Sequence, residues 1–185
     1  MASNVRLANA FRLGGINLAE KQALIGGEWL TAGSTTGGAG KNGEYEVENP
    51  ASGAVVARLI KCGKDETDRA IAAASEAFKT WSRRPPKDRA AVLMRWHDEC
   101  VAARDDITHI MTTECGKPLA EARNEFDSGV ESLRFFAAEA TRTLGDYIPG
   151  DDSRDFVVIK QPLGVVGAIS PWYALSRRLD TLTLT

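Results

Sequence analysis

The sequence predicts an α/β fold made of a β hairpin, three helices and the first strands of an incomplete sheet. Two observations support this fold. Short alternating or wholly apolar runs, separated by turn residues, stand at both ends of the chain. Between them, apolar residues recur at three- and four-residue spacing, and proline or glycine punctuates the helical stretches. The length of 185 residues is enough for a real hydrophobic core.

Strands are expected before the helices. Residues 23–30 form a short apolar segment around Gly26-Gly27, which fits a strand or a hairpin. Residues 44–49 alternate, residues 50–53 supply a turn, and residues 54–60 continue as a second strand. This arrangement predicts an antiparallel hairpin.

Three helices are expected next. The first begins near Asp65 and ends before Pro85-Pro86, which opens the second. The second ends at Gly116, and the third runs from Pro118 to Gly145. The repeating apolar positions of the first helix are Ala70, Ile71, Ala74, Ala77, Phe78 and Trp81. The predicted buried stripe of the second is Leu93, Trp96, His97, Cys100, Val101, Ile107, Ile110 and Met111, and that of the third is Leu119, Ala122, Phe126, Val130, Leu133, Ala137 and Ala140.

The last predicted strands lead to a candidate ligand site. A polar loop over residues 149–155 is followed by a strand over residues 156–160 and an apolar strand over residues 165–169. A continuously apolar strand is typical of a parallel sheet, and ligands bind beyond the carboxyl ends of such strands. Ser170 and Trp172 would then lie at a ligand site. A core strand followed by an ordinary turn fits the same residues equally well.

Composition excludes several classes of function. A net charge of −2 and a pI near 5.8 argue against a nucleic-acid partner, and no apolar run is long enough to span a membrane. Three widely spaced cysteines without a secretory signal fit a reducing compartment, so the cytoplasm is expected. Residues 1–22 carry Arg6 and Arg12 and no acid before Glu20, which fits an N-terminal arm or a mitochondrial presequence.

The cysteines are expected to be structural. Cys100 lies on the apolar stripe of a helix, and Cys115 lies at a helix C-terminus, whose dipole disfavours a thiolate. Cys62 has Lys61 and Lys64 beside it, but nothing places a general base there. No metal site is predicted. Its donors would be His97, Cys100, His109 and Cys115, but a structural zinc site needs four convergent ligands, usually in tighter pairs.

Four stretches of the chain together carry a resemblance: residues 49–53 (NPASG), Ala77-Phe78 with Trp81, residues 114–122 (ECGKPLAEA) and residues 161–172 (QPLGVVGAISPW). In their order and spacing they resemble the aldehyde dehydrogenase family, and the resemblance covers residues 11–172. Within that family, residues 23–30, 111–122 and 158–164 most resemble the succinate-semialdehyde dehydrogenases.

The resemblance implies a function and a site. It implies the N-terminal part of that fold, with the first strand or strands of a Rossmann-like NAD(P)-binding domain. The backbone at Ile169 and Ser170 and the side chain of Trp172 would line the nicotinamide-ribose side of NAD or NADP. The parent substrate would be a small-molecule aldehyde, succinate semialdehyde, oxidised to its carboxylate. The implied partners are further copies of the chain or a full-length paralogue.

The chain departs from the family after Trp172. The family continues with an asparagine that donates to the developing oxyanion, and then a proline, whereas this chain has Tyr173-Ala174. The family's cofactor lysine, catalytic cysteine and general-base glutamate lie further on, so no catalytic residue is assigned here. Residues 173–185 are expected to be a tail foreign to the family, and residues 23–172 a partial domain.

These departures predict a truncated protein that is inactive alone and does not hold the cofactor by itself. Helices and strands that would pack on the absent sheet would then be left uncovered. The residues expected to face solvent or a partner are Phe126, Leu133, Phe135, Phe136 and Val166.

Overall fold

The computed structural model describes residues 12–13, 16–17, 23–30 and 43–171. These ranges contain four two-stranded antiparallel sheets and four helices, which confirms the α/β class. The strands are β1 (Arg12–Leu13), β2 (Ile16–Asn17), β3 (Ala23–Ile25), β4 (Glu28–Leu30), β5 (Glu44–Glu48), β6 (Val55–Ile60), β7 (Asp146–Asp151) and β8 (Arg154–Val158). The helices are α2 (Lys64–Trp81), α3 (Pro86–Ala102), α4 (Arg104–Cys115) and α5 (Leu119–Glu139).

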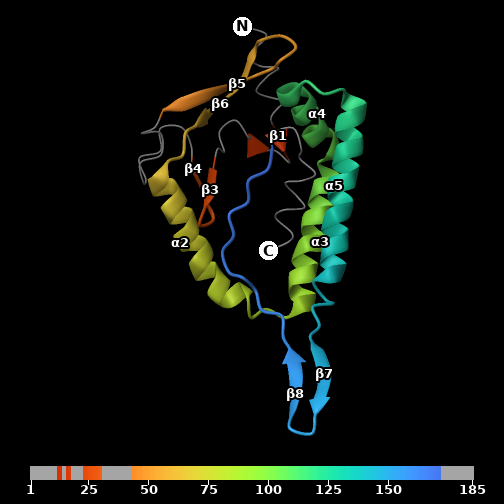
Figure 1. Cartoon of the computed structure of the whole chain (residues 1–185). Helices are drawn as coiled ribbons and strands as arrows, with labels where there is room; N and C mark the ends of the chain where they lie inside the picture. The colour runs from red at the N-terminus through yellow and green to blue at the C-terminus, as the bar shows by residue number, and fades with distance from the viewer. Residues whose placement is uncertain (1–11, 14–15, 18–22, 31–42, 172–185) are drawn as a thin grey trace.

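The helices fall into two groups. Helices α3, α4 and α5 lie together, while α2 stands apart from them on the side of β3 and β4 (Figure 1). The β7–β8 hairpin projects from one end of the molecule, beyond the connection between α2 and α3. The chain then runs back from β8 along the length of the helices toward the end that holds β1.

The predicted hairpin over residues 44–60 is confirmed, and residues 23–30, for which a strand or a hairpin was predicted, form a hairpin. Residues 23–30 form β3 and β4, joined by Gly26 and Gly27 with φ values of 61° and 85°. A two-residue turn with positive φ at both positions matches the twist of the flanking strands, and glycine adopts it without strain. The second hairpin pairs Glu44 with Ile60 at one end and Glu48 with Val55 at the other.

Helix α2 is positioned by its N-terminus and by one small side chain. The carboxylate of Glu66, which is buried, accepts a 2.7 Å hydrogen bond from the N–H of Gly63 and so caps the first turn. Ala73 lies over the β3–β4 turn, where a Cβ on Gly26 would be 3.6 Å from the Ala73 Cβ. The predicted apolar face of α2 is not buried. Its residues Ala70, Ile71, Ala74 and Ala77 are exposed, and Phe78 and Trp81 are half-buried.

The prediction of one continuous second helix is wrong. Ala103 has φ −97° and ψ 12°, outside the helical range, and its N–H is shared between the carbonyls of Glu99 and Cys100. Asp105 and Asp106 then stand in the first turn of α4, where a helix N-terminus favours acidic side chains. The break separates α3 from α4, and each of them packs against α5.

Helix α5 carries the core, as predicted. Its buried residues include Ala122, Phe126, Val130, Leu133 and Ala137, while Leu119 is exposed and Ala140 half-buried. Phe126, Val130 and Leu133 cluster with Cys100 of α3, and Trp96 and Ile107 pack against that cluster. The expectation that Phe126 and Leu133 face solvent is therefore wrong, because α3 and α4 cover them. The exposure expected for Phe135 and Val166 is confirmed, and Phe136 is half-buried.

The second helical stripe also needs correction. Cys100 and Met111 are buried, and the remaining predicted positions are half-buried except Val101, which is 47% exposed. Val101 lies in the last turn of α3, next to the break at Ala103. Because the helix is interrupted at Ala103, the predicted positions belong to two helices and do not form one continuous stripe.

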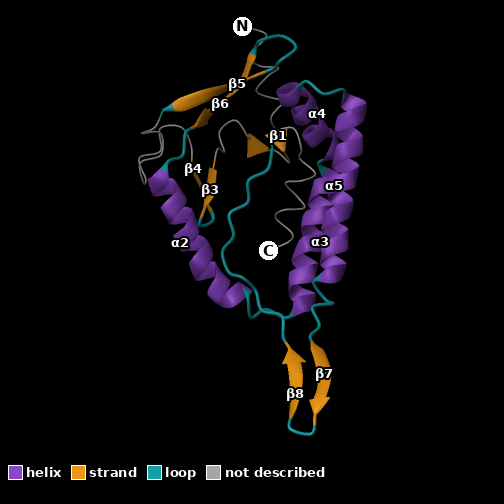
Figure 2. Ribbon diagram, in the orientation of Figure 1, coloured by secondary structure: helices purple, strands orange, loops and turns teal. Residues whose placement is uncertain are grey.

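The prediction of a polar loop over residues 149–155 is wrong in part. Residues 146–151 and 154–158 pair as the β7–β8 hairpin (Figure 2), and its turn is closed by Asp151, whose carboxylate accepts the N–H of Ser153 at 2.9 Å. A Cβ on Gly150 would lie 1.9 Å from the carbonyl oxygen of Arg154. This close approach needs glycine, so the polar composition hides a strand that contains a bulge.

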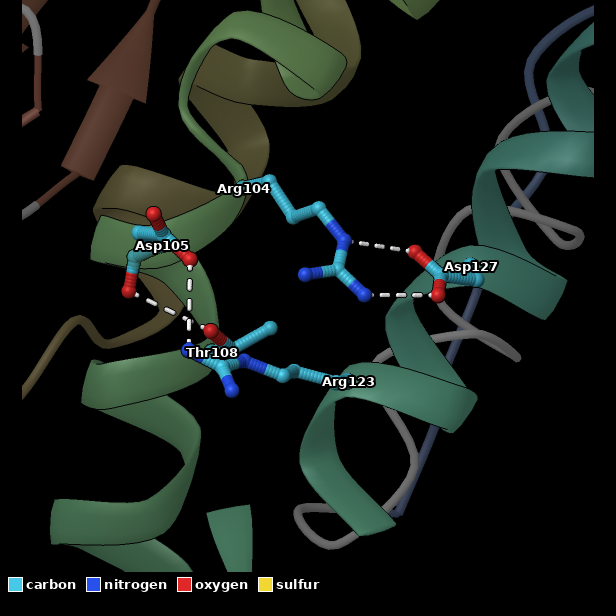
Figure 3. A network of polar contacts seen from close by, with 5 residues as sticks. All are labelled: Arg104, Asp105, Thr108, Arg123 and Asp127. Atoms are coloured by element: carbon cyan, nitrogen blue, oxygen red, sulfur yellow. Dashed lines mark hydrogen bonds and ion pairs between the residues drawn. The ribbon is translucent and has the colours of Figure 1, made fainter. Parts of the chain in front are cut away.

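Two ion pairs join α4 to α5 (Figure 3). The guanidinium of Arg104 donates two hydrogen bonds of 2.7 Å to the two carboxylate oxygens of Asp127. The guanidinium of Arg123, on α5, lies 3.5 Å from a carboxylate oxygen of Asp105, on α4. Nearby, the buried hydroxyl of Thr108 donates to the carbonyl of Asp105 at 3.2 Å. The contacts hold α4 in place directly after the break.

The Arg104–Asp127 pair predicts acid-sensitive stability. Hydrogen bonding from Arg104, reinforced by the charges of Arg104 and Arg123, lowers the pKa of Asp127. A lowered folded-state pKa adds stability above the unfolded value, about 3.9, and that stability is lost as the pH falls through the folded pKa. We therefore expect Asp127→Asn to melt below wild type at pH 6, and the difference to shrink at pH 3. Asp152→Asn, which removes an exposed carboxylate that lies outside the helices and has no ion pair among the described residues, should not show this convergence.

Candidate functional site

The segment that should carry the site, residues 161–171, is not a strand. The prediction of a buried strand over residues 165–169 is wrong: no ladder pairing is formed there, and Leu163 and Ile169 are 96% and 99% exposed. A Cβ on Gly167 would meet no atom within 4 Å. A strand needs a neighbour for its N–H and C=O groups, and no strand in the described part of the chain pairs with this segment.

The predicted site residues lie in this open segment. Ile169 is almost fully exposed, Ser170 is half-buried, and Trp172 lies outside the described residues. Within the described part of the chain, the predicted site residues are therefore not enclosed by other elements. A nicotinamide ring held at Ile169 and Ser170 would need further protein to cover its other side.

The pKa values of Cys62 and Cys100 show no sign of an activated thiolate. Partial burial, followed by the charge of Glu66, raises the pKa of Cys62. Burial, followed by the charge of Glu99, raises the pKa of Cys100. Both shifts oppose nucleophilic chemistry at neutral pH. Cys62 is exposed, Cys100 is buried and Cys115 is half-buried.

Metal ligands do not gather in the described ranges. Nδ1 of His97 lies 2.9 Å from the Asp98 carboxylate, while Cys100 faces the core. Across the residues that the structure describes, no three His, Cys, Asp or Glu side chains come together in a way that could hold a metal ion. In the same residues, no helix is long and apolar enough to cross a membrane.

Two of the sequence motifs meet in space. Gly116, in the stretch 114–122, has φ 73° and ends α4, and its Cα faces Pro50 of the stretch 49–53. A Cβ on Gly116 would lie 2.7 Å from Cγ of Pro50. Next to it, Lys117 forms an ion pair with Glu125 of α5, and both side chains are more than four-fifths buried.

These motif residues join the β5–β6 hairpin to the turn between α4 and α5, and they carry no reactive group. Sequence reasoning did not find this joint, because the stretches are far apart and Pro50, Gly116 and Lys117 share no periodic pattern. The sequence does contain one hint of this contact: a proline in a predicted turn and a glycine at a predicted helix end, both of which mark places where chain segments can approach closely.

Comparisons with known proteins agree on one family. The sequence profile described as "Aldehyde dehydrogenase family" matches residues 38–174. A glutarate-semialdehyde dehydrogenase of Pseudomonas putida is 44% identical over 157 residues, which is 84% of this chain and 31% of that protein. The NADP⁺-dependent succinate-semialdehyde dehydrogenase of Escherichia coli is 42% identical, with 87% of this chain and 32% of the enzyme covered.

Solved structures show the same arrangement of the backbone. A succinate-semialdehyde dehydrogenase from Burkholderia pseudomallei has a TM-score of 0.78 and 37% identity, covering 94% of this chain and 35% of that one. An aldehyde dehydrogenase from Brucella melitensis has a TM-score of 0.80 and 35% identity over 91% of this chain. The chain thus spans about a third of the length of the relatives that it matches.

Proposed function

Because the chain belongs to the aldehyde dehydrogenase family, we propose that it supplies the N-terminal part of an enzyme that oxidises a semialdehyde with NAD⁺ or NADP⁺. The observation that supports this most is the identity of 42–44% to enzymes named for succinate and glutarate semialdehyde. Both substrates are short aldehydes with a carboxylate at the far end. The proposed substrate class is therefore an ω-carboxylated aldehyde, oxidised to a dicarboxylate.

The proposed coenzyme contact is the segment from Ile169 to Trp172. Within it, Ile169 is 99% exposed and offers an apolar surface of the kind that packs against a nicotinamide ring. The Escherichia coli relative is named for NADP⁺, which supports either nicotinamide coenzyme here. When bound, such a coenzyme would accept the hydride removed from the aldehyde.

We expect the 185-residue polypeptide to be inactive by itself. The pKa values of Cys62 and Cys100 are raised, and the proposed coenzyme contact at Ile169 is open on one side within the described residues. The test is absorbance at 340 nm with purified chain, NAD⁺ or NADP⁺, and succinate semialdehyde. The Escherichia coli enzyme serves as the positive control, and heat-denatured chain serves as the blank. NAD(P)H formation above that blank would contradict the expectation.

A second candidate function is association with a full-length aldehyde dehydrogenase subunit. The supporting observation is the exposure of Leu163, Val166 and Ile169 in a segment whose composition suits a buried strand. Tagged chain should then co-purify with the Escherichia coli enzyme and change its rate. Val166→Asp should weaken that association, whereas Lys79→Asp, on the exposed C-terminal turn of α2, should not.

Two compartments are proposed. The cytoplasm fits the cysteine content, and the mitochondrion fits if residues 1–22 act as a presequence. The Arabidopsis thaliana relative, 42% identical, is named as mitochondrial. A fluorescent fusion with and without residues 1–22 distinguishes the two, since only a presequence makes import depend on those residues.

A further inference from the structure

The turn that joins α2 to α3 gathers positive charge on the surface of a chain whose net charge is −2. We define the basic corner as the cations of this turn, Arg83, Arg84, Lys87 and Arg89, among which Asp88 is the one acid. No ion pair within the described residues involves any of these cations. Other cations of the helices do pair with acids, including Lys64, Lys79, Arg104 and Arg134. The basic corner therefore carries positive charge that the described part of the chain leaves largely uncompensated.

Local contacts hold the basic corner in one shape. The guanidinium of Arg84 lies 5.6 Å from the ring centre of the half-buried Trp81, which is a cation–π contact. Arg89 donates to the carbonyl of Arg84 at 3.4 Å and so ties the turn to the first turn of α3. Pro85, with φ −53° and ψ 140°, restricts the backbone between these groups, and Pro86 begins α3. Because a guanidinium that is already held loses less conformational entropy on binding, this arrangement favours a ligand.

The exposure of the basic corner favours an extended ligand with several negative charges. Arg83, Arg84 and Lys87 are exposed together with both prolines, and Arg89 is half-buried. Guanidinium groups bind carboxylates through pairs of parallel hydrogen bonds. One small anion would meet only part of a set of cations that spans residues 83–89. An acidic stretch of polypeptide supplies carboxylates at successive positions, so it complements the whole set.

Two other classes of polyanion fit the basic corner less well. A nucleic acid carries charge along its whole length and would also meet the rest of this chain, where acids outnumber cations. An anionic membrane is bound by basic side chains together with apolar side chains that enter the lipid. No large apolar side chain is exposed between residues 72 and 100, all of which the structure describes. The charge pattern therefore favours a protein partner.

We propose that the basic corner docks an acidic segment of a different protein. The carboxylates of that segment bind the arginine and lysine side chains of the corner, and its backbone crosses the exposed Pro85 and Pro86. Opposite charge steers the encounter and selects the partner. This inference does not rest on the proposed reaction, since no residue of the basic corner belongs to the proposed coenzyme contact.

The first test is fluorescence anisotropy of a labelled glutamate-rich peptide titrated with the full chain. We expect its dissociation constant to rise by about tenfold or more between 0.1 M and 0.5 M salt, because salt screens exposed charges. Arg84→Glu/Lys87→Glu should raise it at least as much in 0.1 M salt. No binding in 0.1 M salt, or binding that is insensitive to salt, overturns the proposal.

The matched control is Lys61→Glu/Lys64→Glu, which makes the same change in net charge. These two exposed lysines lie at the other end of the 18-residue helix α2, about 25 Å from the basic corner and beyond the Debye length of about 10 Å. The control should therefore leave peptide binding nearly unchanged. Equal losses in the two double variants would show that the peptide responds to net charge alone, which overturns the proposal.

A charge-conserving variant gives the sharper test. Arg84→Lys keeps the positive charge but loses the paired hydrogen bonds and the stacking on Trp81, so the dissociation constant should rise by about threefold or more. Far-UV circular dichroism confirms that each variant is folded. Oligo-dT and phosphatidylserine vesicles are titrated in the same buffer as competing classes of polyanion. Tighter binding of either one, or unchanged peptide binding by folded Arg84→Lys, overturns the proposal.

Discussion

Replacing Phe126 with alanine is expected to lower the free energy of unfolding by about 3–5 kcal/mol. Phe126 is 1% exposed and packs with Cys100, Val130 and Leu133, the cluster that holds α5 against α3 and α4. The cost combines the lost transfer of the ring from water with the cavity left between the helices. Because a domain of this size is stable by only about 5–15 kcal/mol, the variant should unfold well below the wild-type urea midpoint.

Phe135 on the same helix is the matched control. It is 59% exposed and contacts Phe136 edge to face, with ring centres 5.2 Å apart. Phe135→Ala removes the same atoms from a helix of the same propensity, so it should cost less than about 1.5 kcal/mol, mostly from the lost aromatic pair. Urea unfolding followed at 222 nm measures both variants. Equal losses would show that the α3–α4–α5 cluster is not the core of this chain.

The sequence predicted best where a pattern is local and repeated. The stripe of α5 through Phe126, Val130 and Leu133 follows from three- and four-residue spacing, and the structure buries it. The β3–β4 turn is one of the two alternatives that Gly26-Gly27 predicted, and glycine adopts the required positive φ freely. In both cases the local sequence and the contact with adjacent elements are enough to form the predicted structure.

The sequence failed where the outcome depends on several elements at once. The break at Ala103 has no proline or glycine to mark it, and it places Arg104 within reach of Asp127, 23 residues further on. The β7–β8 hairpin was hidden by turn-type residues, because Pro149 and Gly150 are rare in strands except at bulges. Local propensity alone cannot predict either feature.

The predicted strand at the candidate site is wrong, and the coenzyme contact there stays a prediction. The apolar run from Val165 to Ile169 has the composition of a strand buried on both faces, yet it is exposed and unpaired within the described residues. An apolar composition shows that a segment is suited to a buried strand. The strand forms only when neighbouring strands are present to pair with it. The proposed coenzyme contact at Ile169 and Ser170 has the same requirement, since it needs protein on its other side.

Replacing Gly116 with alanine is expected to destabilise the chain for two separable reasons. Its φ of 73° costs an alanine about 1–3 kcal/mol. The new Cβ would also lie 2.7 Å from Cγ of Pro50, and such overpacking costs roughly a further 1–3 kcal/mol. Gly53→Ala isolates the first term, because Gly53 has φ 67° and open space around its missing Cβ. The difference between the two variants in urea unfolding therefore estimates the contact with Pro50.

A double-mutant cycle with Pro50→Ala decides whether the two motifs depend on each other. If the Gly116–Pro50 contact fixes how the β5–β6 hairpin meets the α4–α5 turn, Gly116→Ala should cost less in the Pro50→Ala background by about 0.5–3 kcal/mol. Strictly additive losses would mean that the turn and the hairpin are held independently, for example through the Lys117–Glu125 ion pair alone. A favourable coupling would explain why a turn proline and a helix-end glycine, 66 positions apart in the numbering, belong to one structural unit without any reactive group between them.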